Sequence, residues 1–198
     1  TLSSGSTIRG LAINRFGGYG MSIGASNSVI VANFIGTDVT GTIDLGNGAA
    51  GIQIAGSGNL VGGVTAADAN LIAFNQQAGV TVFPAGSGNA VIGNVFRDNV
   101  GLGIDLGDDG LTTNDSDDSD TGANGLQNFP VLSTVRTTGT EVIITGTIQS
   151  TPNATFRIEF YRDVAGSADA SGYGEGRELI GSANITTSGA GNASFDIT

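Results

Sequence analysis

The chain lacks several residue types on which protein chemistry commonly depends. Its 198 residues include no Cys, His, Trp or Lys, and only 3 Pro. Without Cys, a disulfide scaffold and thiolate chemistry are excluded, and without His the commonest general base and transition-metal ligand are missing. No apolar run approaches the length of a membrane span, so insertion into a membrane is not expected.

Positively charged residues are also scarce. Seven basic residues, all of them Arg, stand against 18 acidic ones and give a net charge of −11. Such a chain repels nucleic acid and anionic membranes, which argues against both as partners and favours cations. The 34 Gly do not recur at every third position, so they are typical of short strands and tight turns rather than of collagen.

What the chain does have is a repeat. A phrase containing Gly followed by an apolar residue occurs four times: Tyr19-Gly20-Met21-Ser22-Ile23, Ala50-Gly51-Ile52-Gln53-Ile54, Ala78-Gly79-Val80-Thr81-Val82 and Leu102-Gly103-Ile104-Asp105-Leu106. Once insertions at 36–48 and 64–69 are removed, one repeat is about 22 residues. The insertions are expected to project as loops, and stacked units of this kind are the signature of a solenoid.

Within each repeat the apolar residues alternate with small or polar ones over three to five positions, the period of a strand. We therefore predict an all-β fold that begins with a right-handed parallel β-helix of about four coils, with aligned side chains filling its bore. The residues expected to point inward share a constant registration: Ile8, Ile13, Ile30, Ile35, Val61, Ile72, Val91 and Phe96.

Gly and Asn also fall into columns. The Gly of each phrase is expected to be a turn residue with backbone angles that a Cβ would forbid. Polar columns are predicted at Ser6, Ser28, Asn59 and Asn89, and at Asn33, Asn70 and Asn94, where a side-chain amide can bond to a neighbour one rung away. Asn75 and Asn99, four residues before their Gly, fit a structural role or a ligand-binding one.

An acidic stretch follows the fourth phrase. Together with Asp105, residues 107–122 hold seven Asp. Clustered carboxylates are the hard oxygen ligands that Ca²⁺ prefers, so Ca²⁺ is the predicted cofactor; the spacing does not match an EF-hand, and a solvated linker is the alternative. The candidate metal ligands are Asp108, Asp109, Asp115, Asp117, Asp118 and Asp120.

The remainder of the chain has a different texture. Val131–Arg136, Glu141–Ile148, Thr155–Arg162, Glu178–Thr187 and Ala193–Thr198 alternate apolar and polar residues as strands of an antiparallel sandwich do. The predicted domains are parallel β-helix repeats at 1–107, an Asp-rich linker at 108–129 and a small Ig-like β-sandwich at 130–198. The connection at 163–176 is expected to be a long turn or a binding loop.

Four phrases resemble those of bacterial secreted or cell-surface proteins with right-handed parallel β-helix repeats followed by an Ig-like module. They are Asn33-Phe34-Ile35-Gly36-Thr37-Asp38-Val39-Thr40-Gly41-Thr42, Gly103-Ile104-Asp105-Leu106-Gly107-Asp108-Asp109-Gly110, Thr121-Gly122-Ala123-Asn124-Gly125-Leu126-Gln127-Asn128-Phe129-Pro130 and Phe156-Arg157-Ile158-Glu159-Phe160-Tyr161. The resemblance implies a secreted or cell-surface location and carries over no catalytic residues. At the level of fold alone the repeats also resemble pectate lyases and polygalacturonases.

Two functions compete. The first is a non-enzymatic extracellular structural or adhesion module that binds glycan and is stabilised by calcium. The second is a polysaccharide lyase or glycoside hydrolase acting on acidic polysaccharide, which needs positioned acids or a strong base beside a cation. Partners of the first kind are polysaccharide or neighbouring copies that pair through exposed strand edges.

Both ends of the expected fold look incomplete. The first recognisable coil begins at Ser6, which leaves five residues, too few for the cap that an open first rung needs. About five strands follow position 130, where an Ig-like module usually has about seven. We therefore expect the chain to be a piece of a longer protein.

Overall fold

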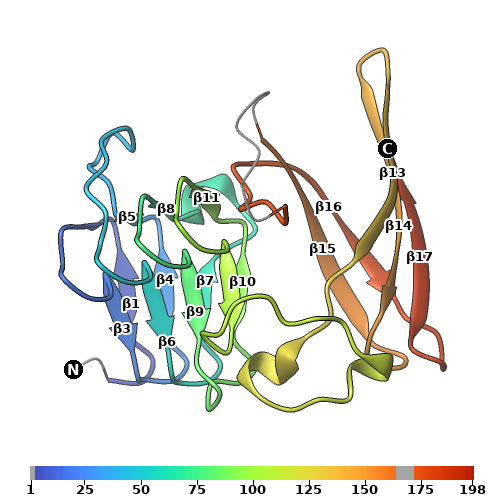
Figure 1. Cartoon of the computed structure of the whole chain (residues 1–198), viewed down its shortest axis with the longest axis horizontal. Coiled ribbons are helices and arrows are strands. Elements are labelled where there is room, and N and C mark those ends of the chain that lie inside the picture. Colours follow the sequence, from blue (N-terminus) through green and yellow to red (C-terminus); the bar gives the residue numbers. More distant parts are fainter. Residues whose placement is uncertain (1–2, 164–171) are drawn as a thin grey trace. The chain divides into compact units, whose positions relative to one another are not determined.

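The computed structural model describes residues 3–163 and 172–198, and its first half is a parallel β-solenoid (Figure 1). Short strands repeat in sets of three, and each set contributes one strand to each of three sheets. Figure 1 shows these strands stacked in sequence order from blue to green. They are β1 (Thr7–Arg9), β2 (Ala12–Ile13), β3 (Met21–Ile23), β4 (Val29–Val31), β5 (Phe34–Ile35), β6 (Ile52–Ile54), β7 (Leu60–Gly62), β8 (Leu71–Ala73), β9 (Val80–Val82), β10 (Ala90–Ile92), β11 (Val95–Arg97) and β12 (Ile104–Leu106).

The sheet orders establish the repeat. They are β1-β4-β7-β10, β2-β5-β8-β11 and β3-β6-β9-β12, and the neighbours are parallel. The chain makes about three turns between its first and last visits to the first sheet, so the predicted count of about four coils is slightly too high. The difference arises because the fourth set, β10 to β12, adds one strand to each sheet but no later strand returns to the first sheet, so the fourth turn is incomplete.

The predicted registration of the apolar columns is confirmed. Ile8 pairs with Ile30, Ile30 with Val61, and Val61 with Val91. Ile13, Ile35, Ile72 and Phe96 form the second column in the same way. Side chains of the middle rungs, such as Ile30 and Ile72, are fully buried, whereas Ile8, Ile13 and Val91 at the ends are only partly covered. Sharing burial between rungs is what lets such short strands order.

The Gly of each phrase is needed for a reason other than the predicted one. Gly20, Gly51, Gly79 and Gly103 do not have positive φ. Instead, a Cβ at Gly51 would lie 2.7 Å from the carbonyl oxygen of Gly79 in the next rung. The prediction of forbidden backbone angles is therefore wrong, and close approach between rungs excludes a side chain at these positions.

The Asn columns are continuous hydrogen-bonded ladders. Three ladders run along the solenoid: ladder I (Asn33, Asn70, Asn94), ladder II (Asn47, Asn75, Asn99) and ladder III (Ser28, Asn59, Asn89, Asn124). In ladder II, the backbone N–H and the side-chain amide of Asn75 both donate to Oδ1 of Asn99, at 3.1 and 2.8 Å. Each buried amide is thereby satisfied by its neighbour, as buried polar groups require.

The two insertions form loops, as expected. The first contains a bridge between Thr37 and Asp44, and Arg97 donates from its guanidinium to the carbonyl of Gly41 within it. The second contains the 3₁₀ turn η1 (Ala66–Asp68), which an ion pair of 3.0 Å between Arg9 and Asp68 ties to the first rung.

The second half contains two small sheets. Strands β13 (Val131–Thr138), β14 (Glu141–Gln149) and β17 (Asn192–Ile197) form an antiparallel sheet, and β15 (Thr155–Arg162) pairs with β16 (Glu178–Thr186). Their shared core consists of Ile144, Ile148, Ile158, Phe160 and Phe195. Two 3₁₀ turns precede the sheet, η2 (Ser116–Asp118) and η3 (Ala123–Leu126).

The chain divides into two compact units. Unit 1 comprises 1–112, 122–124 and 161–180, and unit 2 comprises 113–121, 125–160 and 181–198. Segments from the second half of the sequence thus belong to the same compact unit as the solenoid. The domain boundaries at 107 and 129 stay a prediction.

Candidate functional site

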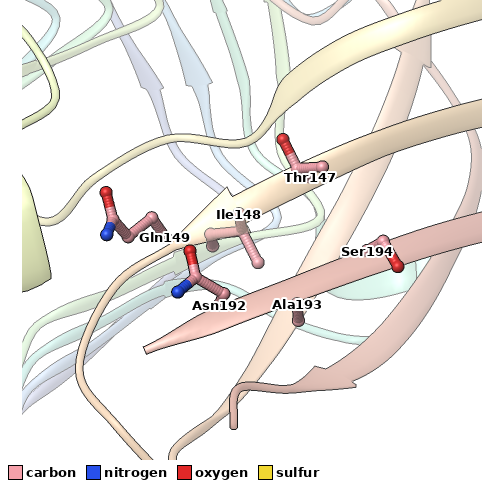
Figure 2. Close-up of a pocket in the computed structure, with 6 residues that line it drawn as sticks. All are labelled: Thr147, Ile148, Gln149, Asn192, Ala193 and Ser194. Carbon is pink, nitrogen blue, oxygen red and sulfur yellow. The ribbon is translucent and has the colours of Figure 1, made fainter. Parts of the chain in front are cut away.

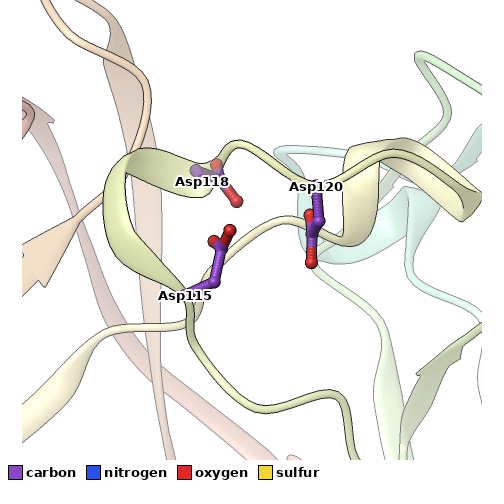
Figure 3. A group of neighbouring side chains, drawn as sticks. All are labelled: Asp115, Asp118 and Asp120. Carbon is purple, nitrogen blue, oxygen red and sulfur yellow. The ribbon is translucent and has the colours of Figure 1, made fainter.

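Three of the six candidate metal ligands come together in unit 2. Asp115, Asp118 and Asp120 each place a carboxylate oxygen so that all three atoms lie within 4.8 Å of one another. Figure 3 shows Asp115 and Asp118 pointing toward one another, with Asp120 beside them. The chain folds back here because Asp117 and Asp118 have φ of 63° and 55°, the left-handed conformation that Asp tolerates better than most residues.

Neighbouring groups hold two of these carboxylates in place. Asp118 Oδ1 accepts the backbone N–H of Asn128 at 2.9 Å, and Asp118 Oδ2 accepts the hydroxyl of Ser150. Asp115 Oδ2 accepts the N–H and the hydroxyl of Ser119 at 3.2 and 3.0 Å. The side-chain amide of Asn128 also bridges the backbone carbonyls of Asp115 and Gln149. The cluster is thus connected to the end of β14.

Two carboxylate oxygens of the cluster have no hydrogen-bond donor among the described residues. They are Asp115 Oδ1 and Asp120 Oδ1, and both atoms are buried from solvent. Burial, reinforced by the charges of Asp115 and Asp118, raises the pKa of the Asp120 carboxyl above its ordinary value. A buried anionic oxygen without a donor is costly unless a cation compensates it.

The other three candidate ligands lie elsewhere. Asp117 is exposed on η2 and is not among the converging carboxylates. Asp108 and Asp109 belong to unit 1, where Asp108 accepts the hydroxyl of Thr81 at 3.2 Å. Nearby, burial raises the pKa of Asp105, and the charges of Asp108 and Asp109 add to the effect.

The remaining acids of the solenoid have local partners. Asp38 accepts from Thr40, Thr42 and Ile43 in its own loop. Asp68 accepts from Thr65 and Arg9. These carboxylates are held as turn-forming and ion-pairing groups, an arrangement typical of structural Asp.

Asp98 pairs with two arginines. Arg97 approaches it at 2.7 Å and Arg177 at 2.8 Å. Adjacent residues of one strand point to opposite faces, but Asp98 lies just beyond the end of β11 and has φ of 57°. Its carboxylate can therefore reach the guanidinium of Arg97.

Among the described residues, two hollows are candidate ligand sites. The first, of about 470 Å³, lies where β14 pairs with β17 (Figure 2). Its exposed polar groups are the hydroxyls of Thr147 and Ser194 and the amides of Gln149 and Asn192, which face each other as cross-strand pairs. Such a surface can exchange hydrogen bonds with a neutral polar ligand.

The second hollow, of about 290 Å³, lies on the outer wall of the solenoid. Phe34, Leu71 and Val95 occupy equivalent positions in neighbouring strands and form its floor. None of its lining residues carries a carboxylate or a base, so the hollow offers no group for acid-base hydrolysis.

The predicted loop at 163–176 lies partly outside the described residues, which stop at Asp163 and resume at Gly172. In the part of the chain that the structure describes, no helix has the length and apolarity needed to cross a membrane. Neither the models of known protein families nor the curated proteins yield a match to this chain.

Proposed function

We propose that the chain is a non-enzymatic structural or adhesion module of a secreted or cell-surface protein, and that Ca²⁺ stabilises it. Ca²⁺ would bind at Asp115, Asp118 and Asp120. The observation that carries this proposal is the pair of buried carboxylate oxygens that lack donors inside a three-carboxylate cluster. Carboxylates supply the oxygen ligands that Ca²⁺ takes, with backbone carbonyls and water completing its six to eight positions.

The effect of Asp120→Asn on the melting temperature should depend on calcium. Without calcium, Asp120→Asn removes like-charge repulsion from a carboxyl with a raised pKa, so the variant should melt at a higher temperature than the natural protein at pH 7. In millimolar calcium the natural protein should melt above its calcium-free value, and the variant should respond much less. Differential scanning calorimetry in chelator and in calcium measures both effects.

Asp117→Asn is the matched control. Asp117 belongs to the same turn but is exposed and outside the converging group, so this variant should keep the calcium response. Isothermal titration should show calcium binding by the natural protein and by Asp117→Asn. An equal melting temperature in chelator and in calcium for the natural protein would exclude a structural ion.

Two finer proposals concern partners. Glycan binding is supported by the four polar side chains of the hollow between β14 and β17. Pairing with neighbouring copies is supported by β13, which ends its sheet and has all eight residues exposed. An unpaired strand edge is a template for strand addition.

We propose further that the solenoid is right-handed and that β13–β17 form an Ig-like module of a bacterial surface protein. The handedness follows from the rule for parallel crossover connections. The sandwich and the origin rest on the resemblance of the sequence phrases and on the antiparallel pairing of β13, β14 and β17.

The alternative is a polysaccharide lyase or glycoside hydrolase. The local hydrogen bonds of Asp38 and Asp68 favour the non-enzymatic proposal, because a catalytic carboxylate must be free to exchange protons with substrate. A screen of acidic polysaccharides for new reducing ends and unsaturated products, with and without calcium, separates the two. Product above that of the heat-denatured protein would refute the non-enzymatic proposal.

A further inference from the structure

A residue distant in sequence takes the place of the next Asn at the end of ladder II. The backbone N–H of Asn99 donates to Oε1 and Oε2 of Glu175 at 3.0 and 3.2 Å, and its side-chain amide donates to Oε2 at 2.6 Å. In the preceding rungs the same two donors of Asn47 and Asn75 go to Oδ1 of the following Asn. The Glu175 carboxylate therefore completes the ladder.

The main chain of Glu175 continues a second column. A Cβ placed on Gly103 would lie 2.5 Å from the carbonyl oxygen of Glu175. The same test on each earlier glycine of the repeat, Gly20, Gly51 and Gly79, brings the Cβ to 2.7–2.8 Å from the oxygen of the next glycine in the column. In addition, the N–H of Phe96 in β11 donates to the carbonyl of Gly176 at 3.0 Å. The main chain of residues 175 and 176 thus occupies the position of a further rung.

A second residue closes ladder III. The N–H of Asn89 donates to Oδ1 of Asn124 at 2.9 Å, and Asn124 returns a bond from its amide to the carbonyl of Asn89 at 2.7 Å. Both closing residues belong to the same compact unit as the solenoid. The ion pair of Arg177 with Asp98 at 2.8 Å lies beside Glu175 in sequence and ties the same segment to the turn after β11.

We propose that residues 175–177 and Asn124 form a cap in cis, which closes the last rung and prevents a second copy of the chain from pairing with it. In every ladder the N–H donors face the following rung, so the end of the solenoid presents donors to whatever covers it. A carboxylate is a strong partner for such donors because the hydrogen bonds are charge-assisted.

A second copy is the occupant that the cap excludes. Without the cap, the donors of Phe96 and Asn99 would form an open parallel edge, which templates further pairing. β1, β2 and β3 end their three sheets at the opposite side, so a second copy offers parallel strands with the same registration. Such a head-to-tail contact does not close on itself and would extend. This inference does not rest on the proposed function.

Removing the carboxylate tests the cap. In Glu175→Ala, amide exchange at Phe96 and Asn99 should quicken by about tenfold or more, since local opening loses hydrogen bonds to a charged group. The variant should also form larger species as concentration rises in light scattering. Glu175→Gln keeps a side-chain oxygen that accepts from Asn99, so it should stay close to the natural protein in both measurements.

Two results would overturn the proposal. Unchanged exchange at Phe96 and Asn99 in Glu175→Ala would show that residues 175–177 do not close the rung. Faster exchange with a monomer at every concentration would show that the closed edge does not exclude a second copy. If circular dichroism shows that Glu175→Ala does not fold, amide exchange and light scattering are measured on Glu175→Asp, whose side chain is one methylene shorter.

Discussion

Asn75 shows what one buried amide contributes to the solenoid. It is fully buried, and its Oδ1 accepts both the N–H and the side-chain amide of Asn47, at 3.3 and 2.8 Å. Asn75→Ala leaves those two donors without an acceptor, at about 1–3 kcal/mol for each buried donor. Gln77→Ala, an exposed amide two residues later, should cost less than about 0.5 kcal/mol.

Urea unfolding followed by circular dichroism compares these two variants. The free energy of unfolding should fall clearly in Asn75→Ala and remain near that of the natural protein in Gln77→Ala. Equal stability of the two variants would contradict a ladder that stabilises the fold, and would leave Asn75 open to a ligand-binding role instead.

The hydrogen bonds that the Asp38 carboxylate accepts should make the stability of the first loop depend on pH. The Thr40 hydroxyl, which donates to both carboxylate oxygens at 2.9 and 2.8 Å, is the main reason that the pKa of Asp38 is lowered to about 2, and the N–H groups of Ile43 and Thr42 add to it. Because the folded-state pKa is depressed, the stabilisation is present above the unfolded value of 3.8 and is lost as the pH falls through about 2.

The Asp38→Asn variant should therefore lack one component of acid destabilisation. Between pH 5 and pH 2 its melting temperature should fall less steeply than that of the natural protein. Parallel melting curves for the natural protein and Asp38→Asn across this pH range would show that the Asp38 contacts do not form in solution.

Among the elements, the Gly column sets how closely the rungs stack. A Cβ at Gly51 would lie 2.7 Å from both the Gly79 carbonyl oxygen and Cγ2 of Ile72. Gly51→Ala should therefore lower the free energy of unfolding by about 1–3 kcal/mol, the usual cost of overpacking. At Gly24 a Cβ meets nothing within 4 Å and φ is not positive, so Gly24→Ala should be neutral or stabilising by up to about 1 kcal/mol.

Chemical denaturation of this pair is a direct comparison because both substitutions add the same methyl group. If Gly51→Ala were as stable as Gly24→Ala, the rungs would have to separate at no cost, and the close approach would not explain the recurrence of Gly. The position of each Gly in the phrase was visible in the sequence, but the cause was not, because an interatomic distance between rungs is a tertiary property.

The elements that repeat were predictable, and the closing residues were not. Registration of the apolar columns follows from fixed offsets in sequence. Asn47 was missed although it carries the same signal as Asn75 and Asn99, since it also stands four residues before the Gly of its phrase. Glu175 and Asn124 occur once, far from the repeat, so no periodicity indicates that they continue ladders II and III.

The acidic stretch was predictable only as a composition. Density of Asp marked 105–120, but the backbone decides which side chains converge. Positive φ at Asp117 and Asp118 turns the chain so that Asp115, Asp118 and Asp120 meet while Asp117 faces solvent. A sequence pattern without a known loop template cannot supply those angles.

For the whole molecule, the net charge of −11 predicts a dependence on salt. Self-repulsion among like charges destabilises a compact chain, and the screening length falls from about 30 Å at 0.01 M to about 10 Å at 0.1 M salt. The melting temperature at pH 7 should therefore rise when NaCl increases over this range. Calcium chloride at equal ionic strength should raise it further in the natural protein, because a bound ion stabilises the folded state by mass action, and should add little in Asp120→Asn. If NaCl and calcium chloride of equal ionic strength acted alike on the natural protein, the whole effect would be screening and the specific ion would be excluded.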